Sequence, residues 1–183
     1  MSKLRSAGLR VCLLALTTLS LAAQQLPRKA GDWAIQTVDG KQIQIGSYRG
    51  KVVLLAFILT TCPHCQKTIG VLSGLQPKYG PLGVQFLASA VEGNAKAAVP
   101  GFVQSFHVPF PVGFNDDVQK VLAFWQNPPA QVPLMPVIML IDRQGVIRFQ
   151  HDGHDSDFFN DQEKRFRAEM DELLRTPARK AAK

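Results

Sequence analysis

Residues 52–65 read VVLLAFILTTCPHC, and this stretch decides the fold of the chain. The run 52–59 is apolar, short and rich in branched side chains, which predicts a buried β-strand. Beyond the cysteines, apolar residues at positions 69, 72 and 75 recur at helical spacing and predict a helix over 66–75. Cys62 and Cys65 therefore lie where a strand ends and a helix begins.

This junction suits thiol chemistry. Thr61 is the expected N-cap of the helix, and Pro63 fits the first turn because no backbone donor is needed there. Cys62 then faces the positive end of the helix dipole, which favours its thiolate. Cys65 follows about one turn later and can reach the same sulfur. The pattern predicts a disulfide that opens and closes during turnover.

Residues 1–22 are typical of a signal peptide. Lys3, Arg5 and Arg10 precede an apolar run over 11–21. This run is short for a membrane span but fits the apolar core of a signal peptide. We expect cleavage after Ala22 and export to the periplasm or another extracytoplasmic compartment, where disulfides persist. An uncleaved membrane anchor is the alternative.

The cysteine count and the net charge narrow the range of possible functions. Of three cysteines, Cys12 lies in the expected signal peptide, which leaves Cys62 and Cys65. A bridge across so short a loop removes little entropy from the unfolded chain, so it fits redox chemistry better than structural cross-linking. The formal net charge is +7 and the pI is near 9.6. Because the basic residues do not cluster on one predicted helix with interleaved aromatics, we expect no nucleic-acid partner.

The rest of the chain alternates strand and helix patterns. We expect a linker over 23–33, one domain over 34–175 and a disordered basic tail over 176–183. The turn Asp39-Gly40 predicts a hairpin between strands at 35–38 and 41–45. Further strands are expected at 84–90, 137–141 and 146–150, with a short extended piece at 110–112. Helices are expected at 95–106, 116–125 and 157–175.

This order of elements predicts an α/β fold, a sandwich of layers around a mixed sheet. A C-x-x-C pair at a strand–helix junction makes the pattern thioredoxin-like. The segments that carry a family resemblance are Gly50-Lys51-Val52-Val53, Cys62-Pro63-His64-Cys65, Met135-Pro136 and Asp142-Arg143-Gln144-Gly145. In this order they resemble the exported TlpA/ResA-like thiol–disulfide oxidoreductases, a thioredoxin branch bordering the AhpC/TSA redoxins. The resemblance spans residues 31–174 and implies a three-layer sandwich with an N-terminal hairpin extension and a strand–helix insert.

The cysteine motif suggests a role for each of its members. Cys62 is the expected nucleophile, and Cys65 is the expected resolving thiol that releases the partner. His64 is expected to stabilise the Cys62 thiolate and so to make the disulfide more oxidising. The dipeptide Pro63-His64 is similar to that of DsbA-type oxidants.

Residues outside the motif complete the expected site. The resemblance implies a cis bond before Pro136, although Pro133 competes for that role, and contact of Met135 with an extended partner chain. Thr61 stands where relatives often have tryptophan, and we count it with Met135 as substrate-binding. Glu92, near the end of the next strand, is expected to assist proton transfer at Cys65.

We therefore predict an exported thiol–disulfide oxidoreductase that acts on protein thiols, needs no cofactor or metal, and is reset by a membrane or soluble redox partner. Contact with a membrane is expected only if the N-terminal segment is uncleaved. A thiol peroxidase of the redoxin type is one alternative, although Leu59 stands where such enzymes have threonine. A copper carrier is another, using both cysteines and His64, His151 or His154. Residues 151–154 are otherwise expected to form a solvated turn.

Overall fold

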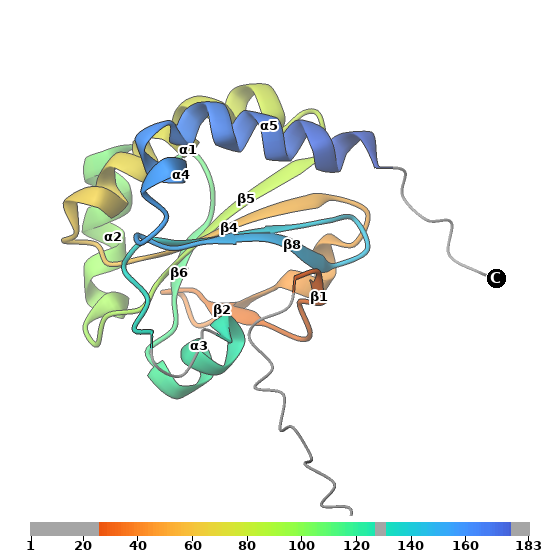
Figure 1. Cartoon of the computed structure of the whole chain (residues 1–183). Helices are drawn as coiled ribbons and strands as arrows, with labels where there is room; N and C mark the ends of the chain where they lie inside the picture. The colour runs from red at the N-terminus through yellow and green to blue at the C-terminus, as the bar shows by residue number, and fades with distance from the viewer. Residues whose placement is uncertain (1–25, 127–130, 177–183) are drawn as a thin grey trace, which may run out of the picture.

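The computed structural model describes residues 26–126 and 131–176. They form one mixed eight-stranded sheet in the order β1-β8-β7-β4-β5-β6-β2-β3, with helices on both faces (Figure 1). The strands are β1 (Arg28–Lys29), β2 (Ala34–Gln36), β3 (Gln42–Gln44), β4 (Val52–Ile58), β5 (Val84–Ala90), β6 (Val112–Phe114), β7 (Val137–Ile141) and β8 (Val146–His151). The α-helices are α1 (Pro63–Tyr79), α2 (Ala95–Phe106), α3 (Val118–Trp125), α4 (Ser156–Asn160) and α5 (Gln162–Arg175), and a short 3-10 helix covers Ile45–Tyr48.

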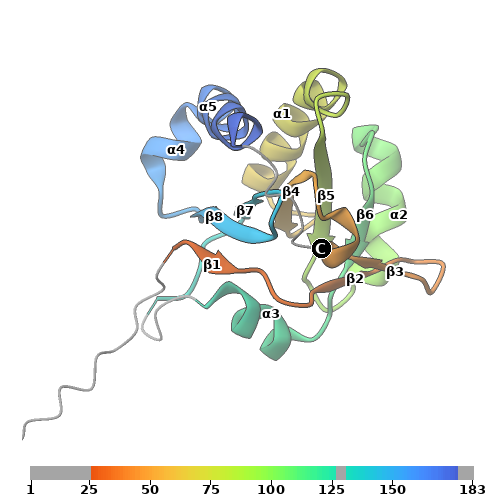
Figure 2. The same cartoon turned by 90° about the vertical axis from the view of Figure 1, so that its right-hand side faces the viewer.

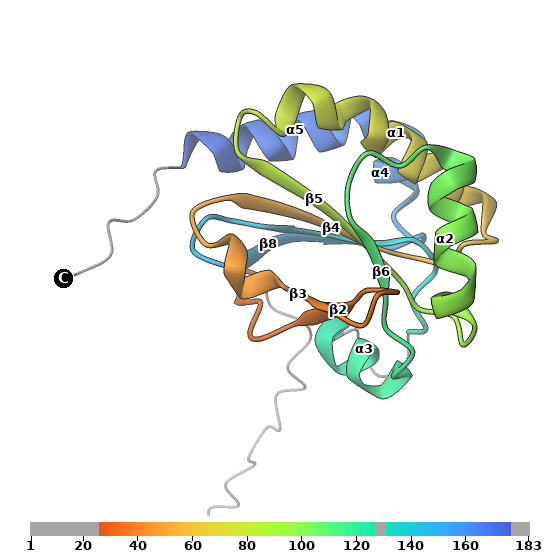
Figure 3. The ribbon, with the colours of Figure 1, turned by 180° about the vertical axis from the view of Figure 1, so that it is seen from behind.

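The predicted three-layer sandwich is confirmed. Helices α1, α2, α4 and α5 cover one face of the sheet, whereas α3 lies against the other (Figures 1 and 2). The predicted N-terminal hairpin is also present, since β2 pairs antiparallel with β3. It joins the edge of the sheet beside β6, as the view from behind shows (Figure 3).

Strand β4 is the centre of the molecule, and all seven of its residues are buried. Successive side chains of a strand point to opposite faces. Leu54 and Ile58 accordingly pack in the core beneath α1, α2 and α5, whereas Leu55 and Phe57 pack in the core beneath α3. A strand buried on both faces has to be apolar at every position, which is why residues 52–59 form one continuous apolar run.

The pairing of β4 fixes what lies beside the cysteines. Strand β4 runs parallel to β5, with Ile58 opposite Ala90, and antiparallel to β7, with Phe57 opposite Val137. The end of β4 therefore meets the end of β5 and the beginning of β7 at one end of the sheet. The segments that follow β4 and β5 and the segment that precedes β7 are brought together there.

The short extended piece expected at 110–112 is β6, which covers Val112–Phe114, and three larger differences from the sequence-based expectations are present. Helix α1 continues to Tyr79 through Pro77, where we expected a break. Tyr79 is buried, so the apolar face of α1 extends one turn past Leu75, and this packing outweighs the proline. The range 23–33, expected to be a linker, contains β1, which pairs antiparallel with β8.

The third difference is at the C-terminus, where the single expected helix over 157–175 is two helices. Asp155 caps α4 by accepting a hydrogen bond from Phe158 N, and the chain turns at Asp161 before α5. The expected signal peptide, residues 127–130 and the tail beyond Thr176 lie outside the described residues.

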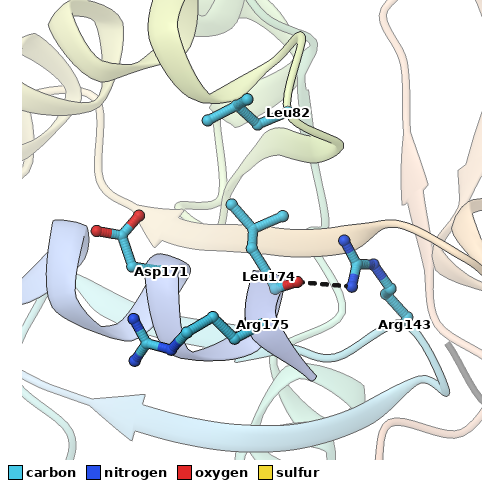
Figure 4. Close-up of a pocket in the computed structure, with 5 residues that line it drawn as sticks. All are labelled: Leu82, Arg143, Asp171, Leu174 and Arg175. Atoms are coloured by element: carbon cyan, nitrogen blue, oxygen red, sulfur yellow. Dashed lines mark hydrogen bonds between the residues drawn. The ribbon is translucent and has the colours of Figure 1, made fainter. Parts of the chain in front are cut away.

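At the other end of the sheet, the β7–β8 turn holds the end of α5. Arg143 Nη1 donates to the carbonyls of Leu174 at 2.9 Å and Thr176 at 2.8 Å, and Leu82 lies opposite across a shallow pocket (Figure 4). These bonds satisfy carbonyls that a helix end leaves without partners. Within residues 26–126 and 131–176, no helix has the length and apolar character to cross a bilayer.

Candidate active site

The cysteine pair sits at the start of α1. Cys62 is the N-cap residue, its backbone N donates to Leu59 O at 3.1 Å, and its carbonyl accepts from Gln66 N at 3.0 Å. The expectation that Thr61 caps this helix is wrong. Pro63 occupies the first helical position, so the cap falls on Cys62, and no side chain makes a capping hydrogen bond.

The two sulfurs differ in exposure and environment. Cys62 is partly buried, Cys65 is fully buried, and both are free thiols. Leu59 N donates to Cys65 Sγ at 3.4 Å. Burial raises the pKa of Cys65 to about 12; the Leu59 hydrogen bond opposes this, whereas Cys62 and Glu92 add to it. Cys65 therefore keeps its proton at neutral pH.

Glu92 follows β5 and reaches Thr60, which lies just beyond the end of β4. Its Oε1 accepts from Thr60 N at 2.9 Å and also from the Thr60 hydroxyl. Its Oε2 is buried and has no hydrogen-bond partner among the described residues. Glu92 Oε2 is therefore a hydrogen-bond acceptor without a partner among the described residues, close enough for the Glu92 charge to act on Cys65.

Thr60 and Gln66 complete the cysteine turn, and sequence reasoning missed both. Gln66 Nε2 donates to Thr60 O at 2.9 Å, so both backbone polar groups of Thr60 are held by side chains. Both residues flank the cysteine motif in the sequence, so their positions alone could have marked them as candidates for the turn. Their partnership depends on the path of the turn, which the spacing alone does not give.

The peptide bond between Met135 and Pro136 is cis, as the resemblance implied. Pro136 is buried, and the half-buried Met135 packs against both cores. Just before them, the side chains of Val132 and Leu134 are 81% and 51% exposed. The register of β4 and β7 places this segment beside the end of β4.

Thr61, Pro63 and His64 are all exposed around Cys62. The structure therefore brings Cys62, Cys65 and Glu92 to the end of the sheet where β7 begins after Pro136. His107, in contrast, ends α2 on the exposed surface in a left-handed conformation with φ of 48°.

Residues 151–154 are not uniformly solvated, which corrects our expectation. His151 belongs to β8, its Nδ1 lies 2.7 Å from Asp155 Oδ2, and its Nε2 lies 2.9 Å from Glu169 Oε1. The neighbouring acids and the ring of Phe158, whose centroid is 3.8 Å away, draw the imidazole inward. His154 remains 42% exposed beside Asp152.

The histidines do not join the cysteines in a metal-ligand set. No group of three or more His, Cys, Asp or Glu side chains suited to a metal occurs in the described part of the chain. The copper-carrier alternative needs both cysteines and a histidine in one group, so the geometry does not favour it.

Comparisons with known proteins agree with this geometry. The redoxin family model matches residues 22–166. The thiol–disulfide oxidoreductase ResA of Bacillus thuringiensis strain Al Hakam is 30% identical over 123 residues, which cover 67% of each chain. ResA of Bacillus subtilis strain 168 is 30% identical over 118 residues, or 64% of this chain and 62% of its own.

Solved structures show the same fold. A thioredoxin-family thiol:disulfide interchange protein from Chlorobium tepidum aligns with a TM-score of 0.64 and 22% identity, over 83% of this chain and 99% of its own. A hypothetical protein from Sinorhizobium meliloti aligns with a TM-score of 0.68 and 18% identity, over 87% and 90%. On the family match and the ResA relatives, the chain belongs to the redoxin family, as a ResA-like thiol–disulfide oxidoreductase of the thioredoxin superfamily.

Proposed function

We propose that this enzyme exchanges a Cys62–Cys65 disulfide with the thiols of partner proteins outside the cytoplasm. One observation carries the proposal, namely the unequal burial of two sulfurs placed about one helical turn apart. A partner can reach Cys62, which is partly exposed, whereas Cys65 is enclosed and can exchange only with Cys62.

In the oxidising direction, a partner thiolate attacks the Cys62 sulfur. A disulfide then forms between the partner and Cys62, and the Cys62–Cys65 bond breaks. Cys65 leaves as a thiolate and takes up a proton. A second partner thiolate attacks the partner sulfur of the mixed disulfide and releases Cys62, so that two electrons pass to the enzyme. The reducing direction runs through the same steps in reverse.

Cys65 needs a proton carrier in either direction. Its pKa of about 12 means that it is a poor nucleophile at neutral pH until a base removes its proton. Glu92 is the group we assign to this task, because its Oε2 is buried and unpartnered while Oε1 is fixed by Thr60. Glu92 then holds the proton that Cys65 gives up during attack and returns it when Cys65 leaves.

The partner chain is assigned to the surface that Thr61 and the half-buried Met135 offer beside the buried Pro136. Met135 is half-buried and Thr61 is exposed, and the pairing of β4 with β7 brings the cysteine turn and the segment before β7 to the same end of the sheet. The partners are protein thiols or disulfides of the exported compartment, and a soluble or membrane-bound redox protein resets the pair. Export rests on the basic and apolar pattern of residues 1–22.

The test uses the full chain and two variants, Cys62→Ser and Cys65→Ser. Mixed with an oxidised protein that carries an accessible disulfide, Cys65→Ser should accumulate a stable mixed disulfide through Cys62, because no resolving thiol is present. Cys62→Ser should trap none. The reduced enzyme should also react with iodoacetamide at Cys62 faster than free cysteine does at neutral pH.

Two results would contradict the proposal. One is trapping through Cys65 but not through Cys62, and the other is alkylation of Cys62 no faster than that of free cysteine. Fast and saturable consumption of hydrogen peroxide by the reduced enzyme would instead favour the thiol peroxidase.

A further inference from the structure

The turn over residues 152–155 touches the segment that precedes Pro136. Gly153 N donates to Leu134 O at 2.7 Å. A Cβ atom at Gly153 would lie 2.8 Å from Leu134 Cβ and 3.2 Å from Leu134 C, which is closer than the backbone can accept without moving. The absence of a side chain at this position therefore allows the turn to hold Leu134 by its carbonyl.

His151 anchors this turn to the rest of the fold. It pairs with Ile138 where β8 ends, and its two ring nitrogens contact Asp155 beside α4 and Glu169 on α5. Asp155 also caps α4 through Phe158 N at 3.0 Å, and its own N donates to Asp152 O at 2.8 Å. Figure 2 shows α4 and α5 together on the side of the sheet that borders β8.

The charged groups around His151 are mainly acidic. Burial lowers the pKa of His151, but the hydrogen bonds and charges of Glu169 and Asp155 outweigh it, and the net effect raises the pKa. The charge of Arg165 on α5 lowers the pKa of Asp155, and Asp152 and His154 pair with each other on the turn. His151 is therefore a cation at mildly acidic pH and loses that charge as the pH rises through its raised pKa.

We propose that His151, acting through Asp155 and Gly153, is a positioning residue that fixes Leu134 beside Pro136 and so sets the affinity for the partner chain. With its carbonyl held by Gly153, Leu134 leaves its side chain 51% exposed next to the surface assigned to the partner. Leu134 is thereby the contact for an apolar side chain of the partner, near the cysteine that reacts. This inference rests on the proposed function.

The experiment compares two thiol probes on the oxidised full-length enzyme. One is a peptide dithiol with leucines flanking a cysteine, and the other is glutathione, which is too small to need Leu134. His151→Ala should raise the KM for the peptide about threefold to tenfold with little change in kcat, and it should leave the glutathione rate unchanged. His154→Ala, on the same turn but exposed, is the matched control.

A pH series separates positioning from a general loss of structure. The KM of the unmodified enzyme for the peptide should rise as the pH increases through the raised pKa of His151, and this step should be absent in His151→Gln. A KM that is unchanged in His151→Ala, or an equal fall in the peptide and glutathione rates, would overturn the inference.

A second variant keeps the test valid if His151→Ala folds poorly. Gly153→Ala places a methyl group too close to Leu134 and so displaces Leu134 directly. It should raise the KM for the leucine peptide more than the KM for a peptide in which serines replace the leucines. Gly70→Ala, where a Cβ meets no atom within 4 Å, is its control. Equal KM changes for both peptides would rule out Leu134 as the contact. If glutathione failed to react at Cys62 in the unmodified enzyme, that result would contradict the proposed function itself, and not only the role of Leu134.

Discussion

The cysteine turn over 59–66 and the histidine turn over 151–155 flank the same segment before Pro136, yet they are held by different forces. The cysteine turn relies on burial and on hydrogen bonds to Thr60 from Glu92 and Gln66. The histidine turn relies on the largely buried His151 ring, whose two nitrogens contact two carboxylates. In the first, burial raises the pKa of Cys65 and favours its neutral thiol; in the second, two acids raise the pKa of His151 and favour its charged form.

This difference means that pH acts on the two turns in separate ways. Raising the pH to deprotonate Cys65 creates the nucleophile and so favours chemistry. Raising the pH to deprotonate His151 removes an ion pair and so weakens structure. One end of the sheet therefore carries one group whose proton limits reaction and another whose proton supports binding.

The largest expected effect comes from removing Glu92, the proposed proton acceptor of the cysteine turn. Glu92→Gln should slow the attack of Cys65 on a Cys62 mixed disulfide by about 100-fold at neutral pH, because Cys65 then has no nearby base. The rate should recover as the pH approaches the Cys65 pKa of about 12. Release of a coloured aromatic thiol from Cys62 measures this step in rapid-mixing experiments.

Thr60→Val is the matched control for this prediction. It removes the hydroxyl that binds Glu92 Oε1 but keeps the carboxylate, so its effect on the rate should be much smaller. Equal slowing in both variants would show that Glu92 acts by holding the turn rather than by accepting the proton.

A smaller effect is expected on stability at the histidine turn. The folded-state pKa of His151 lies above its unfolded value, so its contribution is fully present below the unfolded pKa and is lost as the pH rises through the folded pKa. His151→Ala should lower the free energy of unfolding by about 1–3 kcal/mol under mildly acidic conditions and by less in alkaline solution. Urea denaturation at several pH values measures this difference. A deficit that is the same at every pH would contradict the charged pairing.

The smallest effect is expected from the exposed histidine of the motif. His64→Ala should lower the reduction potential of the Cys62–Cys65 pair by about 30 mV if its imidazole stabilises the reduced thiolate, as we expect. We expect the unmodified enzyme to lie between thioredoxin, at about −270 mV, and DsbA, at about −120 mV. Equilibration with glutathione buffers gives both values, and a potential as low as that of thioredoxin would argue against a role for His64.

The sequence alone determined the central strand, the cysteine turn and the order of the later elements. Apolar periodicity and the C-x-x-C spacing are local signals, and they were enough to predict an α/β fold of the thioredoxin type, whereas the family and the three-layer form were implied by the resemblance. The cis bond before Pro136 also agreed with the resemblance. The proposed roles of Cys62, Cys65 and Glu92 remain predictions to be tested by the variants above.

Only the tertiary structure decided which distant residues meet. His151 looked like part of a solvated turn because its partner Glu169 lies 18 positions away on another helix. Gly153 looked like an ordinary turn residue until β7 and β8 paired and brought it against Leu134. Spacing along the chain fixes which face a side chain takes within its own element. Contacts between elements depend on sheet register and helix packing, to which many weak interactions contribute at once.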